Sequence, residues 1–544
     1  MQPPKMMSSL RRLTAGLIAS FVICLAVAPA VPASGGHGKV RTRADKALRD
    51  GDYTAAEKMF RELLGKDAHD NDARLGLSFA LLKQRLLQDA YDQAARVILA
   101  NPLSARAHAL LGSAILASGN FRNSVEEFRT ALSIEENESM AIAGLAMVDF
   151  YENRVELAVR GLRRAVSLDS SEPDYVFNLG QATARSERYK EAADAYERFL
   201  AIAPKTDSDR RARIRGMIDF LRYLGTQGSL YTVTDGNKTT LPFEPVDGRP
   251  ILKLRINGGK ELLRFVLDTG SGMSVVSEET AKKLGLRPVA RGGLARAIGG
   301  GGKFEIVYGF LPSMELGEVK IENVPVYIRH FYDDKTPVDG YLGLSVIAKF
   351  IALLDYGDNS FTLRRQTDSE NHDAWAVANA KDRALPLNSD AFEIPVRTTS
   401  SGFLSGEVRL EGIEKALNFI IDTGATVSVV AEKLATDEEL DAYIQPARMR
   451  VYGAAGVAED VKTLVLPKVV FGNSARERIT AAILDLETVN ETAGFTQNGI
   501  LGGNFLRHFR VTFDFRRGVI RLEPLRKTPK SGDRAPDHVQ HLNQ

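Results

Sequence analysis

The chain has 544 residues, of which 44% are hydrophobic and 26% are charged. This composition is ordinary for globular proteins and excludes a chain that is wholly disordered or fibrous. Lysine and arginine number 71 against 69 aspartates and glutamates, so the net charge of +2 gives no reason to expect nucleic acid as a partner. The length exceeds what one hydrophobic core supports, and about two to four domains are expected.

Basic residues precede an apolar run, residues 13–31, and small residues follow it. This order predicts a secretory signal peptide over residues 1–33 and therefore export, to the periplasm or outside the cell. The alternative is an uncleaved anchor, because the run is nearly long enough to span a bilayer, and only then is the membrane a partner. Cys24, the one cysteine, lies in this segment, which excludes a disulfide framework and a cysteine-based metal site.

Residues 40–225 show helical periodicity and a repeat of 34 residues. Three registers carry it: Tyr53, Leu87, Phe121, Val155 and Tyr189; Ala56, Ala90, Ser124, Ala158 and Ala192; and Phe60, Ala94, Phe128, Leu162 and Tyr196. This period, with small residues where helices touch, resembles the tetratricopeptide repeat (TPR). Five units are expected, followed by a closing helix over residues 207–223. Such an array implies a surface for a peptide or protein partner, with a spacer or self-association role as the alternative.

After residue 225 short runs of valine, isoleucine, leucine and glycine alternate with turns, which is typical of strands. Two segments match each other there: Phe-Val-Leu-Asp-Thr-Gly-Ser-Gly-Met-Ser-Val-Val at 265–276, and Phe-Ile-Ile-Asp-Thr-Gly-Ala-Thr-Val-Ser-Val-Val at 419–430. Each copy is followed by a glycine-based turn 31 residues after its aspartate, then by an apolar segment ending in glycine, then by an acidic-aromatic pair. Four landmarks in the same order indicate a duplicated unit.

The duplicated unit resembles the retropepsin-like lobe of the aspartic protease superfamily, in which an apolar strand leads into Asp-Thr-Gly. The resemblance covers residues 230–365 and 385–525, with a linker at 366–384 and a disordered tail at 526–544. The expected fold class is multidomain: an all-α TPR solenoid followed by two mainly-β lobes that form a pepsin-like pseudo-dimer. Pairing of the lobes between two chains stays open as an alternative.

Peptide hydrolysis without a metal ion or a covalent intermediate needs a base that activates water and an acid that protonates the substrate. Two adjacent carboxylates that share one proton supply both, because like charges so close cannot both ionise. The resemblance implies that Asp268 and Asp422 are this dyad and that the reaction uses neither cofactor nor metal. The scattered histidines likewise show no spacing typical of a zinc site.

Supporting roles in the two catalytic loops follow from the same resemblance and are expected for Thr269, Gly270, Ser271, Thr423, Gly424 and Ala425. The threonines are expected to hydrogen-bond across the pseudo-twofold axis, and the glycines to let the backbone approach the carboxylates. The serine can donate to Asp268, whereas the alanine has no hydroxyl for Asp422, so the dyad is expected to be asymmetric.

The glycine-based turns lie where the family has flaps, and flap residues that contact substrate are expected at Gly299, Gly300, Gly453 and Ala454. A flap closes over the substrate and excludes water. The alternative is a plain hairpin, because glycine suits tight turns in any case.

These features predict an exported aspartic endopeptidase that cleaves a peptide or protein substrate and whose repeat array recruits a substrate or a regulator. The alternative is a non-catalytic binding or assembly protein that uses a protease-like clamp together with the array, since a fold alone does not establish activity. The two lobes are also expected to fold without residues 40–225.

Overall fold

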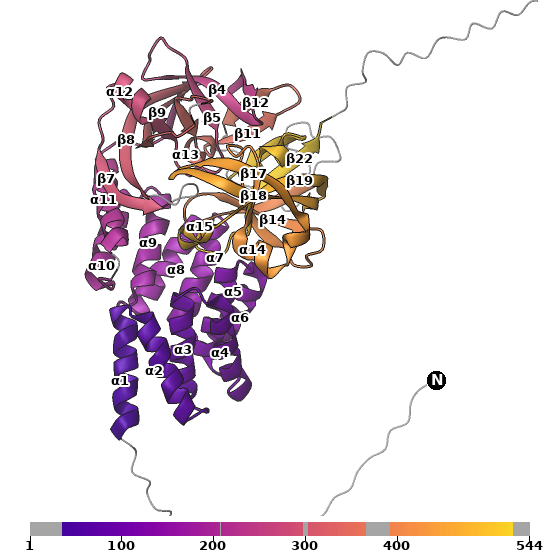
Figure 1. Cartoon of the computed structure of the whole chain (residues 1–544). Coiled ribbons are helices and arrows are strands. Elements are labelled where there is room, and N and C mark those ends of the chain that lie inside the picture. Colours follow the sequence, from indigo (N-terminus) through magenta and orange to yellow (C-terminus); the bar gives the residue numbers. More distant parts are fainter. Residues whose placement is uncertain (1–34, 207, 297–302, 334, 366–391, 526–544) are drawn as a thin grey trace, which may run out of the picture.

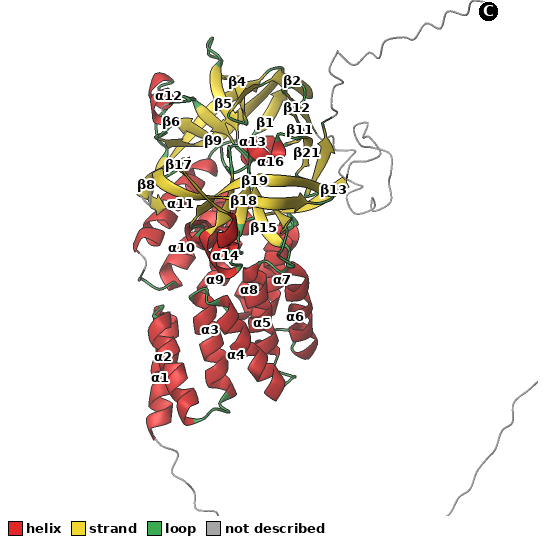
Figure 2. Cartoon of the chain, turned by 45° about the vertical axis from the view of Figure 1, so that its right-hand side comes forward, coloured by secondary structure: helices red, strands yellow, loops and turns green. Residues whose placement is uncertain are grey.

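A computed structural model describes residues 35–206, 208–296, 303–333, 335–365 and 392–525 (Figure 1). The predicted signal segment, the linker and the tail lie outside the described residues. The helices occupy the first half of the chain and the strands the second, as Figure 2 shows. Within the described ranges, no helix has the length and apolar character that crossing a membrane requires.

The helical half is a stack of antiparallel helix pairs. Its helices are α1 (Gly35–Asp50), α2 (Tyr53–Lys66), α3 (Asn71–Lys83), α4 (Leu87–Ala100), α5 (Ala105–Ser118), α6 (Phe121–Ile134), α7 (Ser139–Tyr151), α8 (Val155–Leu168), α9 (Pro173–Arg185), α10 (Tyr189–Ile202) and α11 (Ser208–Leu224). The predicted 34-residue register is confirmed, because the five residues of its first series are the first residues of α2, α4, α6, α8 and α10.

Small residues let the paired helices approach closely. A Cβ added to Gly112 would lie 2.8 Å from the ring of Phe128, and one added to Gly180 would lie 3.0 Å from the ring of Tyr196. Both rings belong to the third register of the repeat and are buried. The array is thus held by large side chains of one helix that pack on small positions of its neighbour.

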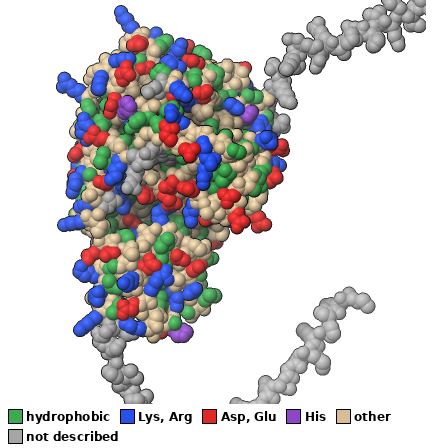
Figure 3. Space-filling view, viewed as in Figure 1, with side chains coloured by type: hydrophobic (Ala, Val, Ile, Leu, Met, Phe, Trp, Pro, Cys, Tyr) green, Lys and Arg blue, Asp and Glu red, His purple; other side chains and the backbone are tan. Residues whose placement is uncertain are grey.

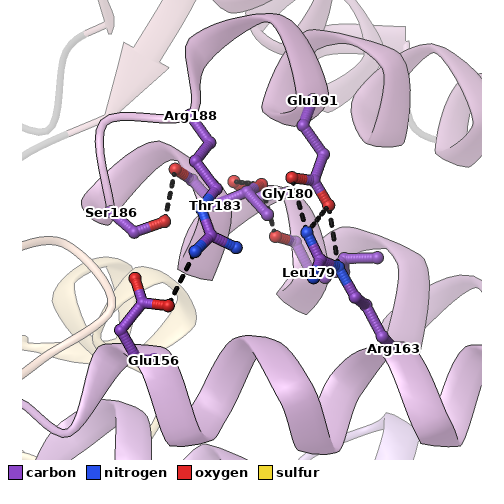
Figure 4. Close-up of polar contacts among 8 residues, drawn as sticks. All are labelled: Glu156, Arg163, Leu179, Gly180, Thr183, Ser186, Arg188 and Glu191. Carbon is purple, nitrogen blue, oxygen red and sulfur yellow. Dashed lines mark hydrogen bonds and ion pairs between the residues drawn. The ribbon is translucent and has the colours of Figure 1, made fainter.

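Surface ion pairs link successive repeats, and Figure 4 shows two of them. Arg163 of α8 donates from Nη2 to both carboxylate oxygens of Glu191 on α10, at 2.7 and 2.8 Å. Arg188, at the start of α10, donates to Glu156 of α8 at 2.7 Å. Exposed pairs of this kind contribute at most about 1 kcal/mol each, so packing of the apolar helix faces dominates the stability of the array.

The array winds so tightly that its first repeats contact its last. Lys83, at the end of α3, donates to Glu172 at 2.9 Å and also to Asp174 at the start of α9. A Cβ added to Gly51, between α1 and α2, would lie 2.6 Å from Pro204 after α10. Residues of the array itself therefore occupy part of the space inside its curve.

The last helix of the array, α11, packs on two partners. Ile214, Ile218 and Leu221 join the core of the array, as a closing helix requires. Its other side contacts the first lobe, where the ring of Phe220 stacks on Tyr308 with 4.2 Å between centroids. The sequence predicts only a closing helix here, whereas α11 also connects the array to the first lobe.

The strand-rich half contains two lobes of matching topology. The first lobe comprises β1 (Thr232–Asp235), β2 (Lys238–Pro242), β3 (Glu244–Val246), β4 (Arg249–Ile256), β5 (Leu263–Leu267), β6 (Val275–Ser277), α12 (Glu278–Lys283), β7 (Ala290–Arg296), β8 (Lys303–Leu316), β9 (Val319–Arg329), β10 (Gly340–Leu342), α13 (Leu344–Ile347), β11 (Phe350–Asp355) and β12 (Ser360–Arg365). One sheet of this lobe has the order β1-β9-β6-β10-β5-β4-β8-β7, with β3 on β4.

The second lobe repeats this plan with longer hairpins. It comprises β13 (Phe392–Thr398), β14 (Leu404–Leu410), β15 (Leu417–Ile421), β16 (Ser428–Ala431), α14 (Glu432–Asp437), the 3-10 helix η2 (Leu440–Tyr443), β17 (Ile444–Gly453), β18 (Gly456–Phe471), β19 (Ser474–Leu484), α15 (Glu487–Ala493), β20 (Gly499–Leu501), α16 (Gly503–Leu506), β21 (Phe509–Asp514) and β22 (Val519–Pro524).

Strands of both lobes form one continuous sheet. Its second half runs β13-β22-β21-β11-β12-β2, and β11 of the first lobe pairs antiparallel with β21 of the second, from Ile351 opposite Asp514 to Asp355 opposite Arg510. The lobes therefore pair within one chain in this structure, and the expected fold class is observed.

The array is docked on the second lobe as well as on the first. Phe495, from the segment between α15 and β20, is completely buried in the core of the array. Its ring centroid lies 4.9 Å from that of Phe121 and 5.1 Å from that of Tyr151, with both partners edge-on. Nearby, Arg185 donates to the carbonyl of Thr399 at 2.6 Å. The loops that join the two helices of repeats three to five thus form the seat of this lobe.

Candidate active site

Each candidate aspartate ends a buried strand that runs parallel to a second one. The amide of Asp268, after β5, donates to the carbonyl of Leu342 in β10 at 3.0 Å. The amide of Asp422, after β15, donates to Leu501 in β20, also at 3.0 Å. The apolar sequence before each Asp-Thr-Gly buries these strands on both faces, so the two loops begin from equivalent, rigid positions.

Glycines allow the strand after the catalytic loop to pass directly behind it. A Cβ added to Gly343 would lie 2.7 Å from the backbone of Met273, and one added to Gly502 would lie 2.9 Å from that of Val427. These are the glycines that end the repeated apolar segments. Their contacts leave no room for a side chain at either position.

The threonines of the two loops hold the lobes together. Thr269 accepts the amide of Thr423 on its hydroxyl oxygen at 3.0 Å, and Thr423 accepts the amide of Thr269 at 3.1 Å. Each hydroxyl then donates across the junction at 2.7 Å, to the carbonyl of Ile421 in one direction and of Leu267 in the other. Both threonines are completely buried, so every polar atom of this crossing has its partner inside the protein.

The carboxylate of each loop lies against the glycine of the other. A Cβ added to Gly270 would lie 2.4 Å from Oδ2 of Asp422, and one added to Gly424 would lie 2.7 Å from Oδ1 of Asp268. Any larger residue at either position would force the carboxylates apart. The structure therefore brings both aspartates to the junction of the lobes, where their carboxyl groups interact directly.

The environments of the two carboxylates differ. In each loop the glycine amide donates to its own aspartate, at 2.9 Å in the first lobe and 2.7 Å in the second. Asp268 also accepts the hydroxyl of Ser271 on Oδ2 at 2.6 Å. Asp422 has no hydroxyl donor, and its second donor is the backbone amide of Ala425, at 3.1 Å. A hydroxyl donor stabilises the charged form of a carboxylate, so Asp268 is the better-supported anion of the pair.

Burial raises the pKa of both groups, but the interaction between them acts on the two pKa values in opposite directions. Burial raises the pKa of Asp268, and the hydrogen bonds from Ser271 and Asp422 counteract this. Burial raises the pKa of Asp422 well above its ordinary value, and the charge of Asp268 raises it further. The hydroxyl of Ser271 and the directions of these two pKa shifts both favour the charged form of Asp268 over that of Asp422.

Only one of the two predicted flaps lies within the described residues. Gly299 and Gly300 fall outside them. Gly453 pairs with Gly456 at the end of the β17–β18 hairpin, and Ala454 is in its turn. The hairpin projects from the body of the second lobe towards the side on which β7 and β8 lie (Figures 1 and 2).

The corresponding strands of the first lobe, β7 and β8, rest on the last helix of the array. A Cβ added to Gly216 of α11 would lie 2.1 Å from the carbonyl oxygen of Arg291 in β7. Arg213 donates to the carbonyl of Leu294 at 3.0 Å, and Lys303 forms an ion pair with Asp209. The array thus contacts both strands of this hairpin.

Asp355 and Asp514, the other matched acidic residues, have structural partners. Asp355 accepts Arg510 from the opposite lobe at 2.7 Å, and Asp514 accepts the amide of Arg517 at 3.1 Å. Both contacts stabilise the ends of the shared sheet.

A further charged residue lies near the dyad but belongs to no sequence motif that would reveal it. Arg329, the last residue of β9, contributes to the electrostatic environment of Asp268. Only the register of β9 beside β6 brings it there, and no local spacing in the sequence reveals that register.

No group of three or more histidine, cysteine, aspartate or glutamate side chains within the described ranges is arranged to hold a metal ion. An open pocket of about 480 Å³ lies between the start of α10 and residues 224–230, at the array–lobe junction, and includes neither aspartate. Charged side chains of both signs are interspersed over the face shown in Figure 3.

Comparison with known families agrees with this architecture. The family model described as aspartyl protease matches residues 252–346 and 406–505, one segment in each lobe, and both include the Asp-Thr-Gly loop. Two models of the tetratricopeptide repeat match residues 47–114 and 144–206. The chain therefore combines tetratricopeptide repeats with an aspartyl-protease-like region of two lobes.

Two solved structures show partial similarity to the chain at low identity. An aspartic proteinase from Irpex lacteus is 14% identical over 53% of this chain and 97% of its own, with a TM-score of 0.34. A thermophilic TPR protein from Thermus thermophilus is 20% identical over 34% of this chain and 98% of its own, with a TM-score of 0.30. None of the curated proteins compared with the chain matches it.

Proposed function

We propose that the chain is an exported aspartic endopeptidase in which Asp268 and Asp422 activate a water molecule between the lobes. The observation that supports this most is the approach of each carboxylate to the glycine of the opposite loop, which brings both aspartates to the lobe junction. Export rests on the predicted signal segment, which lies outside the described residues.

The asymmetry of the dyad assigns the two roles. Asp268, whose charged form Ser271 stabilises, accepts a proton from water as the water attacks the peptide carbonyl carbon. Asp422 donates its proton to the carbonyl oxygen, which becomes the hydroxyl of a tetrahedral intermediate. When this intermediate collapses, the proton taken up by Asp268 passes to the amide nitrogen, the carbon–nitrogen bond breaks and the amine leaves. One hydroxyl of the intermediate returns its proton to Asp422, which leaves the other product as a carboxylic acid. The dyad then has one proton again.

The array is proposed to recruit a protein substrate or a regulator. Repeats three to five use one edge to hold the second lobe, and α11 holds the first. The outer surfaces of the earlier repeats, including the exposed Leu99 and Leu103, remain accessible to a partner.

The test is cleavage of a mixed peptide library by the mature protein from about pH 3 to pH 8. Asp268→Asn and Asp422→Asn should each abolish cleavage, and Asp437→Asn, an exposed change on α14, should not. A mixture of the two inactive variants should stay inactive, because the lobes pair within one chain.

If the folded protein cleaves nothing at any pH, the alternative of a non-catalytic peptide clamp takes the place of the protease. Binding of the same library would then be measured, and the array would become the main candidate for the function.

A further inference from the structure

Arg329 extends from the end of β9 on the side of the strand that faces away from the core of the first lobe. Its neighbour Ile328 belongs to that core, and side chains alternate along a strand. Tyr327, which shares the side of Arg329, packs with Tyr308 of β8, and the same cluster includes Met273 of the catalytic loop. The guanidinium of Arg329 therefore lies on the side of the sheet where the catalytic loop and the β7–β8 hairpin meet.

Aromatic rings line the position of this cation. The guanidinium carbon is 5.7 Å from the centroid of Phe331 and 6.0 Å from that of Phe304. Phe304 is the second residue of β8 and lies opposite Ala295 of β7. Contacts of this kind use the face of each ring and leave the N–H groups of the guanidinium available for hydrogen bonds.

No protein group neutralises Arg329 among the residues that the structure describes. Its Nε is buried without a hydrogen-bond partner, and none of those residues forms an ion pair with its guanidinium. By contrast, Arg249 in the same lobe pairs with Asp333 at 3.2 Å. A buried charge without a partner is unfavourable, and proteins keep one where a ligand supplies the opposite charge.

The catalytic Asp268 favours the charged form of Arg329, but no hydrogen bond or ion pair joins the two side chains. Burial lowers the pKa of Arg329, and the nearby Tyr341, Asp268 and Tyr332 favour its charged form. An arginine keeps its charge in such surroundings, so the site remains cationic at any working pH.

We propose that Arg329 binds the carboxylate of an aspartate or glutamate side chain in the substrate, close to the scissile bond on the side of the first lobe. This inference deepens the proposed function and rests on it. A guanidinium offers two parallel N–H donors to a carboxylate, which favours the acidic side chain over its amide counterpart. The flanking rings fit the short apolar stem of the same side chain.

The test compares two peptide libraries that are identical except that one contains glutamate where the other contains glutamine. The full chain should cleave the glutamate library at sites with one acidic residue at a fixed distance from the cut. For a peptide chosen from those sites, kcat/KM should exceed that of its glutamine counterpart by about 10-fold or more.

Arg329→Met keeps an apolar stem and removes the charge, and it should reduce the ratio of the two kcat/KM values to about 1. Because Arg329 also influences Asp268, the readout is this ratio and not the absolute rate on either peptide. Arg329→Lys should keep part of the ratio, since the charge remains without the paired donors. Arg255→Met, a change of an exposed arginine on β4 of the same lobe, should leave the ratio unchanged. Thermal unfolding of each variant shows whether the fold is retained.

Equal cleavage of both libraries by the unaltered protein would overturn the inference, as would an equal loss on both peptides in Arg329→Met. Cleavage of the glutamine peptide reports on the proposed protease activity independently. If neither library is cleaved, binding of the same two peptides to the unaltered chain and to Arg329→Met decides the point. A preference for glutamate that the variant loses supports the pocket, and equal binding refutes it.

Discussion

Replacing Phe495 with alanine should loosen the junction between the array and the second lobe. The ring is completely buried between the edge-on rings of Phe121 and Tyr151, although it belongs to the lobe and they belong to the array. Removing a buried phenylalanine costs about 3–5 kcal/mol, and each aromatic pair adds about 0.5–1.5 kcal/mol. We therefore expect the free energy of opening this junction to fall by at least about 3 kcal/mol.

Native-state hydrogen exchange, followed by mass spectrometry, measures this opening locally, which matters because a chain with several domains does not unfold in a single step. Amides near the junction should lose protection, including that of Thr496, which donates to Ala117 at 2.9 Å. Phe392→Ala is the matched control, since that ring is 50% exposed on β13. Equal protection of these amides in the two variants would refute the idea that the ring of Phe495 holds the array and the second lobe together.

Three further results are expected. Asp422→Asn should flatten the pH dependence of stability. Because the pKa of Asp422 is raised in the folded state, the folded protein holds a proton that the unfolded chain loses above about pH 4. The unfolding free energy of the unaltered protein therefore falls with rising pH, by up to about 1.4 kcal/mol per pH unit. Urea titrations at about pH 4 to 7 would show no such difference if the dyad were ordinary. Ser271→Ala should raise the pKa of Asp268 and move the acidic limb of the kcat/KM profile up by about one pH unit, and an unmoved limb would contradict the roles given to the two aspartates. Gly216→Ala should destabilise the contact of α11 with the first lobe by about 1–3 kcal/mol in thermal unfolding. Gly65→Ala, which has open space around it, should stabilise α2 slightly. Equal effects of the two changes would exclude close packing of α11 on β7.

The sequence predicted those parts of the structure in which local pattern and local geometry coincide. The 34-residue register sets the first residue of five helices because each repeat buries the same positions against its neighbours. The catalytic loops were predictable for a related reason. A strand that ends in Asp-Thr-Gly and occurs twice defines both halves of a site that needs two carboxylates.

The residues that the sequence did not reveal depend on contacts between distant segments. Phe495 is one apolar residue among many until the second lobe is placed on the array. Gly216 has no special position in its helix, and only the approach of β7 makes its lack of a side chain necessary. Arg329 is near the dyad because of strand register, which pairs it with Ser277. Each of these facts is a property of docking, which periodicity and motifs do not encode.

The same docking bears on the prediction that the two lobes fold without the array, which remains untested. Removing residues 40–225 would expose Phe495 on the second lobe and Tyr308 on the first, both of which are now buried. The lobes themselves would stay joined, because the threonine hydrogen bonds and the β11–β21 pairing lie outside the array. The dyad is therefore built by contacts within the two lobes, whereas the array covers apolar surface on each of them. A truncated chain that is poorly soluble yet retains both joints would follow from this arrangement, since exposed aromatic surface promotes aggregation without separating the two carboxylates.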